Sequence, residues 1–243
     1  MTLSTEERSK MGRRNIRRGK ATHREYARYN CTIWHVLPET HAVWTTHHPD
    51  NEYHDCPGEH CHVEVKAEKT WNLPAYIREA EQDAINGAKG SQTLGVGSHW
   101  WIGMKPPLGQ HRRYYHPFYV CAPELHYLER CVQAYTELDW QDVYPRTDEA
   151  LIELRRRMME FRGLPLDYRS REQSQNWRLA SWVPQLEQLA FDAGETAWTL
   201  VLEAPAHTES YHYLHSHYIL EPGLDWAQLL QIAWEKRGSG SSG

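Results

Sequence analysis

The sequence predicts an α/β fold, with a mixed β-sheet flanked by helices and an additional α+β unit towards the C-terminus. Three observations lead to this prediction. Segments with helix and strand patterns follow one another as α-β-β-β-α-β-β-α up to residue 135. Residues 61–66 alternate strictly between apolar and polar side chains, and residues 73–90 space their apolar side chains at helical intervals. A chain of 243 residues can form one large domain or two smaller ones.

The elements of the first unit are read from composition and periodicity. We expect a short helix over 19–30, strands over 31–37 and 41–48, a turn-rich loop over 49–60, a strand over 61–66, a helix over 73–90, strands over 91–104 and 114–123, and a helix over 123–135. In the strand 61–66, Cys61 faces the core with the two valines, whereas Glu64 and Lys66 share the opposite face.

The second unit is predicted from the same signals. We expect helices over 148–161, 183–193 and 225–236, strands over 197–205 and 211–222, and a polar stretch over 167–178. The domain prediction is a basic arm 1–18, a first unit 19–135, a second unit 136–237 and a flexible tail 238–243. The second unit loosely echoes the helix-strand-strand-helix order of the first, with a one-residue gap. If this echo is a repeat, the second copy is expected to lack any E-x-K strand and to be structural.

Charge is distributed unevenly along the chain. The net charge is −5, yet residues 8–28 hold nine Lys and Arg against one acid, Glu25. A basic arm on an acidic body is typical of a protein that binds a polyanion such as DNA, and it is also what a solvated basic tail looks like. The residues expected to grip nucleic acid are Arg13, Arg14, Arg17, Arg18 and Lys20.

The cysteines and the hydropathy pattern bear on location. The five cysteines are irregularly spaced and no secretory signal pattern opens the chain, so we expect free thiols in a reducing cytoplasm, the host's if the protein is phage-encoded. No stretch approaches 18 consecutive apolar residues, so we expect no membrane span.

Asp55, Glu64 and Lys66 form the pattern that points to chemistry. Two carboxylates aimed at one spot repel each other unless a divalent cation lies between them. Mg²⁺ accepts one or two protein carboxylates and keeps positions for water and phosphate. A lysine alongside could orient the attacking water or offset charge on the phosphoryl oxygens. By composition alone, however, an E-x-K strand is equally typical of a solvated strand face.

The stretch HDCPGEHCHVEVKAEKTWNLPAYIREAEQDA, residues 54–84, resembles the core of the PD-(D/E)XK nuclease superfamily, closest to its phage and archaeal Holliday-junction-resolvase-like branch. Asp55, Gly58, the Glu64-Val65-Lys66 strand and the helix from Leu73 match that branch in order and spacing. The resemblance covers about residues 13–125. It implies a restriction-endonuclease-like fold and a deoxyribonuclease that uses Mg²⁺ or Mn²⁺, often works as a homodimer, and holds the metal through Asp55 and Glu64, with Lys66 assisting catalysis.

Three features depart from the family pattern. The acid expected on the opening helix falls at His23, so its catalytic role passes to Glu25 nearby. The glutamine expected on the later helix falls at Glu79, and an acid there would change how the attacking water is held. Asp50, in the pair Pro49-Asp50, competes with Asp55 as the metal-binding aspartate.

Other clusters offer competing sites. Cysteines and histidines over 54–62 suggest zinc, but they lack a second pair at a usual spacing. His215 and His217 are expected to share a strand face. The segment 111–115 (HRRYY) could grip phosphate and stack bases, or could be an ordinary basic loop. Arg155, Arg156 and Arg157 are expected to be solvated. The hypotheses are therefore a metal-dependent DNA endonuclease, a decayed nuclease fold that only binds nucleic acid, and a zinc-stabilised regulatory protein.

Overall fold

The structure is a computed structural model of the chain. It describes residues 21–22, 25–26, 53–54, 60–90, 99–107, 114–174, 177–205 and 212–240. The predicted strands 31–37 and 41–48 and the basic arm lie outside these residues. Residues 21–22 and 25–26, within the predicted helix 19–30, are helical.

Strands and helices alternate along the described chain. The first part contains β1 (Tyr53–His54), β2 (His60–Lys66), α2 (Leu73–Gly90), β3 (His99–Met104), β4 (Tyr119–Pro123) and α3 (Glu124–Tyr135). The second part contains α4 (Trp140–Val143), α5 (Asp148–Arg162), β5 (Leu166–Arg169), α6 (Arg171–Ser174), α7 (Leu179–Asp192), β6 (Thr199–Glu203), β7 (His217–Pro222) and α8 (Gly223–Gly240).

The seven strands of the described residues form one mixed sheet in the order β1-β2-β3-β4-β7-β6-β5. Two pairs are parallel, β2 with β3 and β5 with β6, and each is joined through a connection that contains a long helix. The other neighbours are antiparallel. The predicted α/β class with a mixed sheet is therefore confirmed.

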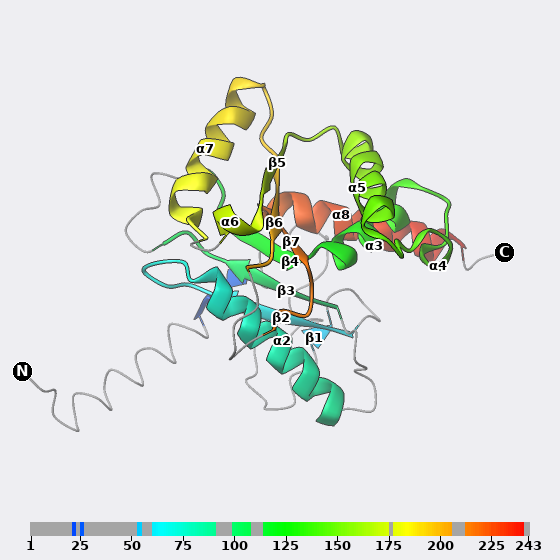
Figure 1. The fold of residues 1–243 in the computed structure, drawn as a ribbon, viewed down its shortest axis with the longest axis horizontal. Coiled ribbons are helices and arrows are strands. Elements are labelled where there is room, and N and C mark those ends of the chain that lie inside the picture. Colours follow the sequence, from blue (N-terminus) through cyan, green and yellow to red (C-terminus); the bar gives the residue numbers. More distant parts are fainter. Residues whose placement is uncertain are drawn as a thin grey trace, which may run out of the picture.

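Helices cover both faces of the sheet. α2 and α7 pack on one face, over a core that includes Trp100, Tyr119, Trp198 and Tyr218. α3, α5 and α8 pack on the other face, and Figure 1 shows α7 and these three helices on opposite sides of β5, β6 and β7. The central strands are buried on both faces and accordingly read as nearly continuous apolar runs.

The helix α5 shows how local sequence sets the ends of an element. The hydroxyl of Thr147 accepts a hydrogen bond from the amide of Ala150 at 3.2 Å, and two acids follow in the first turn. At the other end, Gly163 adopts the left-handed conformation with φ of 62°, which a glycine reaches without steric cost. The helix ends one residue later than the sequence predicts.

Several predicted boundaries are wrong for identifiable reasons. The polar stretch 167–178 contains the short edge strand β5, whose four residues are too polar and too few to give a strand signal. The loop 49–60 contains β1, held by pairing with the start of β2. α7 begins at Leu179, because Leu179, Val183 and Leu186 form its buried stripe and Pro184 is accommodated inside the helix.

The two predicted units meet within the sheet. β4 from the first pairs along five residues with β7 from the second, from Tyr119 opposite Pro222 to Pro123 opposite Tyr218. The segments 19–135 and 136–237 therefore contribute strands to one sheet and side chains to both hydrophobic cores. Among the described helices, none combines the length and the hydropathy needed to cross a membrane.

Candidate metal centre on the face of β2 and α2

The strand β2 places Glu64 and Lys66 on one face of the sheet. Val65 between them is buried in the core beneath α3 and α8, so the two charged side chains point the other way, towards α2. Both are half-buried, with side-chain exposures of 17% and 12%. The predicted alternation of this strand is confirmed at these three positions. The side chain of Cys61 lies outside the description.

The ammonium group of Lys66 lies between two carboxylates. Its Nζ is 2.8 Å from Oε1 of Glu64 and 2.7 Å from Oε2 of Glu79 on α2. It also lies over the ring of Tyr76, 5.6 Å from the centroid. Burial by itself lowers the pKa of Lys66, but the attraction and hydrogen bonds of Glu64 and Glu79 outweigh it and raise that pKa. Lys66 is therefore charged at neutral pH and suited to stabilising negative charge.

Three carboxylates gather around this lysine. Glu64, Glu79 and Asp83 each offer an oxygen, and these oxygens all lie within 4.8 Å of one another. Carboxylates this close together repel one another, and a divalent cation between them relieves that repulsion. Their oxygens are the hard ligands that Mg²⁺ and Mn²⁺ prefer. The donor set of these residues therefore fits such an ion, although exposed acidic groups are common without one.

Helical spacing explains how α2 contributes several side chains to the same site. Tyr76, Glu79 and Asp83 stand three and four residues apart, so one face of α2 carries all three. The sequence marks Glu79 as a departure from the family pattern, and its helical spacing puts Asp83 on the same face, but Asp83 is not among the predicted site residues. The crossover from β2 to β3 lays this helix face against Glu64 and Lys66.

Of the predicted site residues, Glu64 and Lys66 come together and Glu25 does not join them. Both carboxylate oxygens of Glu25 lie 2.6 Å from Nζ of Lys105, which follows β3. The Lys105 ammonium lies over Phe118, and Tyr26 packs with Phe118 in the core of the opposite face. Glu25 therefore belongs to the other side of the sheet from Glu64.

The remaining predicted residues cannot be placed. Asp55, Asp50, His23 and the DNA-gripping residues lie outside the described residues, and so do Arg112 and Arg113. A convergence of Asp55 with Glu64 and Lys66 stays a prediction.

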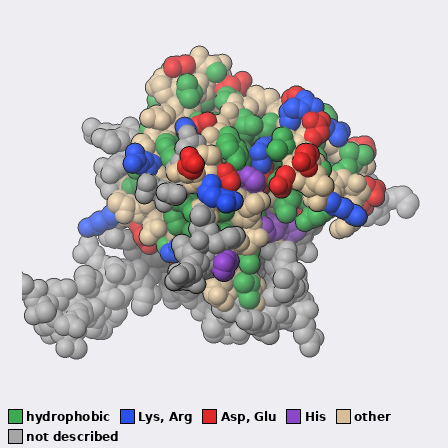
Figure 2. All heavy atoms as spheres, viewed as in Figure 1, with side chains coloured by type: hydrophobic (Ala, Val, Ile, Leu, Met, Phe, Trp, Pro, Cys, Tyr) green, Lys and Arg blue, Asp and Glu red, His purple; other side chains and the backbone are tan. Residues whose placement is uncertain are grey.

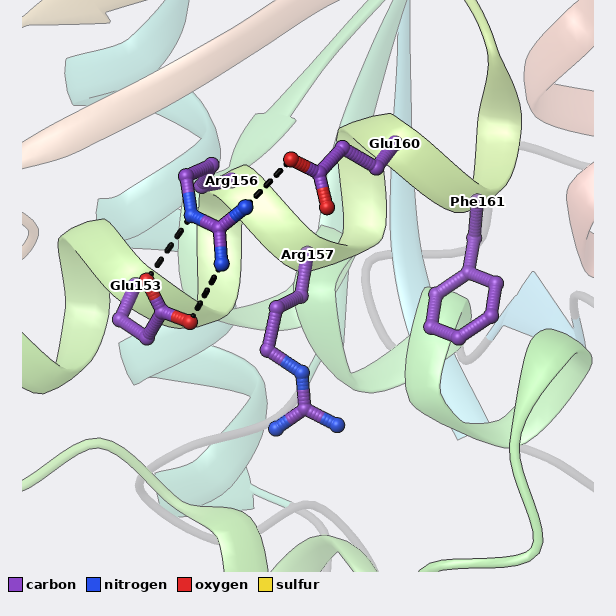
Figure 3. A pocket seen from close by; sticks show the side chains of 5 residues that line it. All are labelled: Glu153, Arg156, Arg157, Glu160 and Phe161. Carbon is purple, nitrogen blue, oxygen red and sulfur yellow. Dashed lines mark hydrogen bonds and ion pairs between the residues drawn. The ribbon is translucent and has the colours of Figure 1, made fainter.

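Of the three arginines of α5 predicted to be solvated, Arg156 and Arg157 are exposed and Arg155 is buried. Arg155 is buried and donates from Nη2 to Glu124 at 2.9 Å, so its expected solvation is wrong. Arg156 and Arg157 are exposed beside a hollow lined by Glu153, Arg156, Arg157, Glu160 and Phe161 (Figure 3). Arg156 is held between Glu153 and Glu160, and Figure 2 shows acids and bases interspersed around α5. All the lining residues come from one helix, so this hollow brings no distant groups together.

The histidines also separate. His215 packs against His126 and Trp100, whereas His217 lies 3.5 Å from Glu124, so the predicted shared face is wrong. The ring of His126 lies 4.6 Å from the ring of His99. Nε2 of His99 is hydrogen-bonded to Oε2 of Glu129 at 2.7 Å. Within the described part of the chain, no histidine belongs to a group of three ligand atoms that all lie within 4.8 Å of each other.

The half-buried histidine His215 makes stability sensitive to acid. Desolvation lowers its pKa to about 4, below the ordinary 6.5, so the unfolded chain binds this proton more readily than the folded protein. The stabilisation is complete above pH 6.5 and is lost as pH falls towards 4. We expect His215→Phe, which keeps a ring against Trp100, to show a smaller fall in Tm between pH 7 and 5 than the parent. Equal falls in calorimetry of the two proteins would contradict this.

Comparisons with known proteins add no relative. No family model matches the chain, and neither a curated protein nor a solved structure matches it.

Proposed function

We propose that this protein is a deoxyribonuclease that hydrolyses phosphodiester bonds with Mg²⁺ or Mn²⁺ at the Glu64, Glu79 and Asp83 carboxylates. The observation that carries the proposal is the charged Lys66 held at 2.8 and 2.7 Å from two carboxylates of a three-acid group. A cationic side chain beside a group of carboxylates suits phosphodiester hydrolysis, because negative charge grows on the phosphoryl oxygens as water adds.

The residues divide the work as follows. A bound divalent ion supplies a water of lowered pKa near neutral pH. Glu64, Glu79 and Asp83 would hold the ion, and Glu64 and Glu79 would also hold Lys66 in position. Lys66 would stabilise the phosphoryl oxygens as the P–O bond to the attacking hydroxide forms and the bond to the leaving sugar oxygen breaks. One of the carboxylates would pass the proton of the attacking water to solvent, and the leaving sugar oxygen would take up a proton from solvent as its P–O bond breaks.

A restriction-endonuclease-like fold is part of this proposal. It is supported by the E-x-K strand β2 followed by α2 and the parallel strand β3. DNA as the partner, including a branched or Holliday-junction-like substrate, is supported by the basic arm with Arg13, Arg14, Arg17, Arg18 and Lys20. A cytoplasmic location also belongs to the proposal.

Substitution can test which aspartate completes the site. Asp50 and Asp55 both lie outside the described residues. Both stay candidates for the additional acid, and Asp50→Asn and Asp55→Asn variants would distinguish them by which one loses cleavage.

The decisive experiment compares the parent with Lys66→Ala on linear, supercoiled and branched DNA. We expect the parent to cleave with Mg²⁺ and to stop when the ion is chelated, and Lys66→Ala to bind DNA but cleave at least about 100-fold more slowly. Lys69→Ala removes the same charge from an exposed position nearby and should cleave like the parent.

The other outcomes are equally informative. Binding of DNA without cleavage by either protein would favour a decayed nuclease fold, a reading that the capture of Lys66 by Glu79 supports. Neither binding nor cleavage would contradict both functions.

A further inference from the structure

Apart from β1, the topology of the sheet is two-fold symmetric. Its other six strands show the same order of parallel and antiparallel contacts from either edge. β2, β3 and β4 stand in the same relation as β5, β6 and β7, with one parallel and one antiparallel contact each. Each set also carries helices in the same places, α2 and α3 in the first, α7 and α8 in the second. We call residues 60–135 the first repeat and residues 166–240 the second repeat.

The register of the two central strands, β4 and β7, agrees with this two-fold relation. Tyr119 of β4 lies opposite Pro222 of β7, and Pro123 of β4 lies opposite Tyr218 of β7. A two-fold rotation between these antiparallel strands therefore exchanges Tyr119 with Tyr218 and Pro123 with Pro222. The same residue types meet in both cases, as a repeat demands.

The cross-sheet row that starts at Glu64 ends at an acid in the second repeat. Residues paired from strand to strand in this row are Glu64, Ile102, Cys121, Leu220, Leu200 and Asp167. Glu64 and Asp167 therefore occupy equivalent edges of the sheet. With neighbouring strands about 4.8 Å apart, they are separated by roughly 24 Å.

Two buried hydrogen bonds cross between the repeats. Tyr218 of the second donates to Glu81 on α2 of the first at 2.6 Å, and Tyr119 of the first donates to Glu187 on α7 of the second. Both glutamates are buried, at 0% and 3% exposure. A buried carboxylate is costly without a hydrogen-bond partner, so the reciprocal arrangement is a specific feature rather than a coincidence of shape.

Aromatic packing repeats in the same way. Tyr119 packs on Trp198 with ring centroids 6.0 Å apart, and Tyr218 packs on Trp100 at 6.1 Å. At the start of the equivalent helices α3 and α8, Tyr127 stacks on Trp226 at 6.0 Å.

The charged pair of β2 has a counterpart on β5. Arg169 lies 2.5 Å from Asp167 and over the ring of Trp182 at 5.3 Å, as Lys66 lies near Glu64 and over Tyr76. The expectation that a second copy lacks an E-x-K strand holds for β5, but β5 carries an acid and a base at the equivalent positions. Asp167-Tyr168-Arg169 preserves the charges but not the residue types, which is why the sequence echo does not reveal it.

The two sites differ on their helices. Tyr76 and Glu81 of α2 are equivalent to Trp182 and Glu187 of α7, which fixes the alignment of the residues between and beyond them. Glu79 then corresponds to Gln185, and Asp83 corresponds to Leu189, which is 61% exposed. Among the described residues at these equivalent positions, the first site has three carboxylates, whereas the second has the carboxylate of Asp167 alone.

We propose that the chain is an internally duplicated single-chain counterpart of a symmetric dimer, in which the first repeat alone binds a divalent cation and reacts. The second part of this statement rests on the proposed nuclease function. Three grouped carboxylate oxygens are ligands that a divalent ion prefers, whereas the equivalent positions of the second repeat offer Asp167 alone. Each encounter with duplex DNA should therefore break one phosphodiester bond and leave a nick.

Metal stoichiometry tests the asymmetry without any cleavage. We expect titration calorimetry with Mn²⁺ to find one ion per chain, to lose it in Asp83→Asn, and to keep it in Asp167→Asn. The double variant Gln185→Glu, Leu189→Asp changes exposed positions only and should gain a second ion. Two ions per parent chain, loss of the ion in Asp167→Asn, or no gain in the double variant would overturn the proposal.

Plasmid cleavage separates this inference from the function on which it rests. Supercoiled DNA with Mg²⁺ should accumulate as the relaxed nicked circle before any linear form appears. Direct conversion to linear DNA would refute single-site reaction while leaving the nuclease function intact. No cleavage of any DNA, with one Mn²⁺ still bound per chain, would instead refute the nuclease function and leave the asymmetric duplication standing.

Discussion

Glu64→Gln should lose Mg²⁺-dependent cleavage by at least about 100-fold, the scale on which one electrostatic group at a reacting centre counts. The substitution keeps the size of the side chain and removes its charge. It leaves two carboxylates against Lys66, so attraction for a divalent ion falls, and it frees Lys66 from one of its two partners. Initial rates of supercoiled-plasmid cleavage at several Mg²⁺ concentrations would measure both effects.

The matched control lies in the second repeat. Asp167→Asn makes the same chemical change at the equivalent position, 2.5 Å from Arg169 instead of Lys66. It should cleave at the parental rate. Equal losses in both variants would mean that the pairs act through the stability of the sheet, and no loss in Glu64→Gln would remove Glu64 from the site.

Arg162→Ala should lower the free energy of unfolding by about 3–5 kcal/mol, the usual consequence of removing one partner of a buried ion pair. Arg162 donates from Nη1 to Glu221 and to the hydroxyl of Tyr127, both at 2.6 Å. The side chains of Arg162 and Glu221 are only 5% and 0% exposed. Chemical denaturation followed by tryptophan fluorescence would measure the change.

The pH dependence of Arg162→Ala distinguishes the cost of leaving the carboxylate of Glu221 buried without its partner from the cost of lost packing. Burial raises the pKa of Glu221 to about 7 even though Arg162 opposes the shift. A carboxyl group with a raised pKa in the folded state loses stabilisation as pH rises, and without Arg162 that pKa rises further. The deficit of Arg162→Ala should therefore be larger at pH 8 than at pH 5.

Arg156→Ala serves as the control for Arg162→Ala because it lies on the same helix. Arg156 also pairs with two acids, Glu153 and Glu160, but its side chain is 56% exposed (Figure 3). Solvent screens such pairs, so we expect little change in stability. A pH-independent loss in Arg162→Ala, or an equal loss in Arg156→Ala, would show that burial of the charge is not what matters.

The sequence alone determined the parts of the molecule with strong local signals. The alternation around Glu64, Val65 and Lys66 specified which of these side chains share a face, because strand geometry has a period of two. The bounds of α2 followed from its apolar stripe and its proline in the first turn. Glu79 was visible as a departure at a position that proves to contact Lys66.

Only the tertiary structure decided which distant groups meet. Asp83 joins Glu64 because the crossover lays α2 against β2, and Glu25 is drawn to Lys105 on the opposite face. The equivalence of Asp167 with Glu64 appears only through strand pairing, since charge was kept while residue types changed. Local periodicity fixes the direction in which each side chain points, whereas its partners depend on packing between segments that no short stretch of sequence encodes.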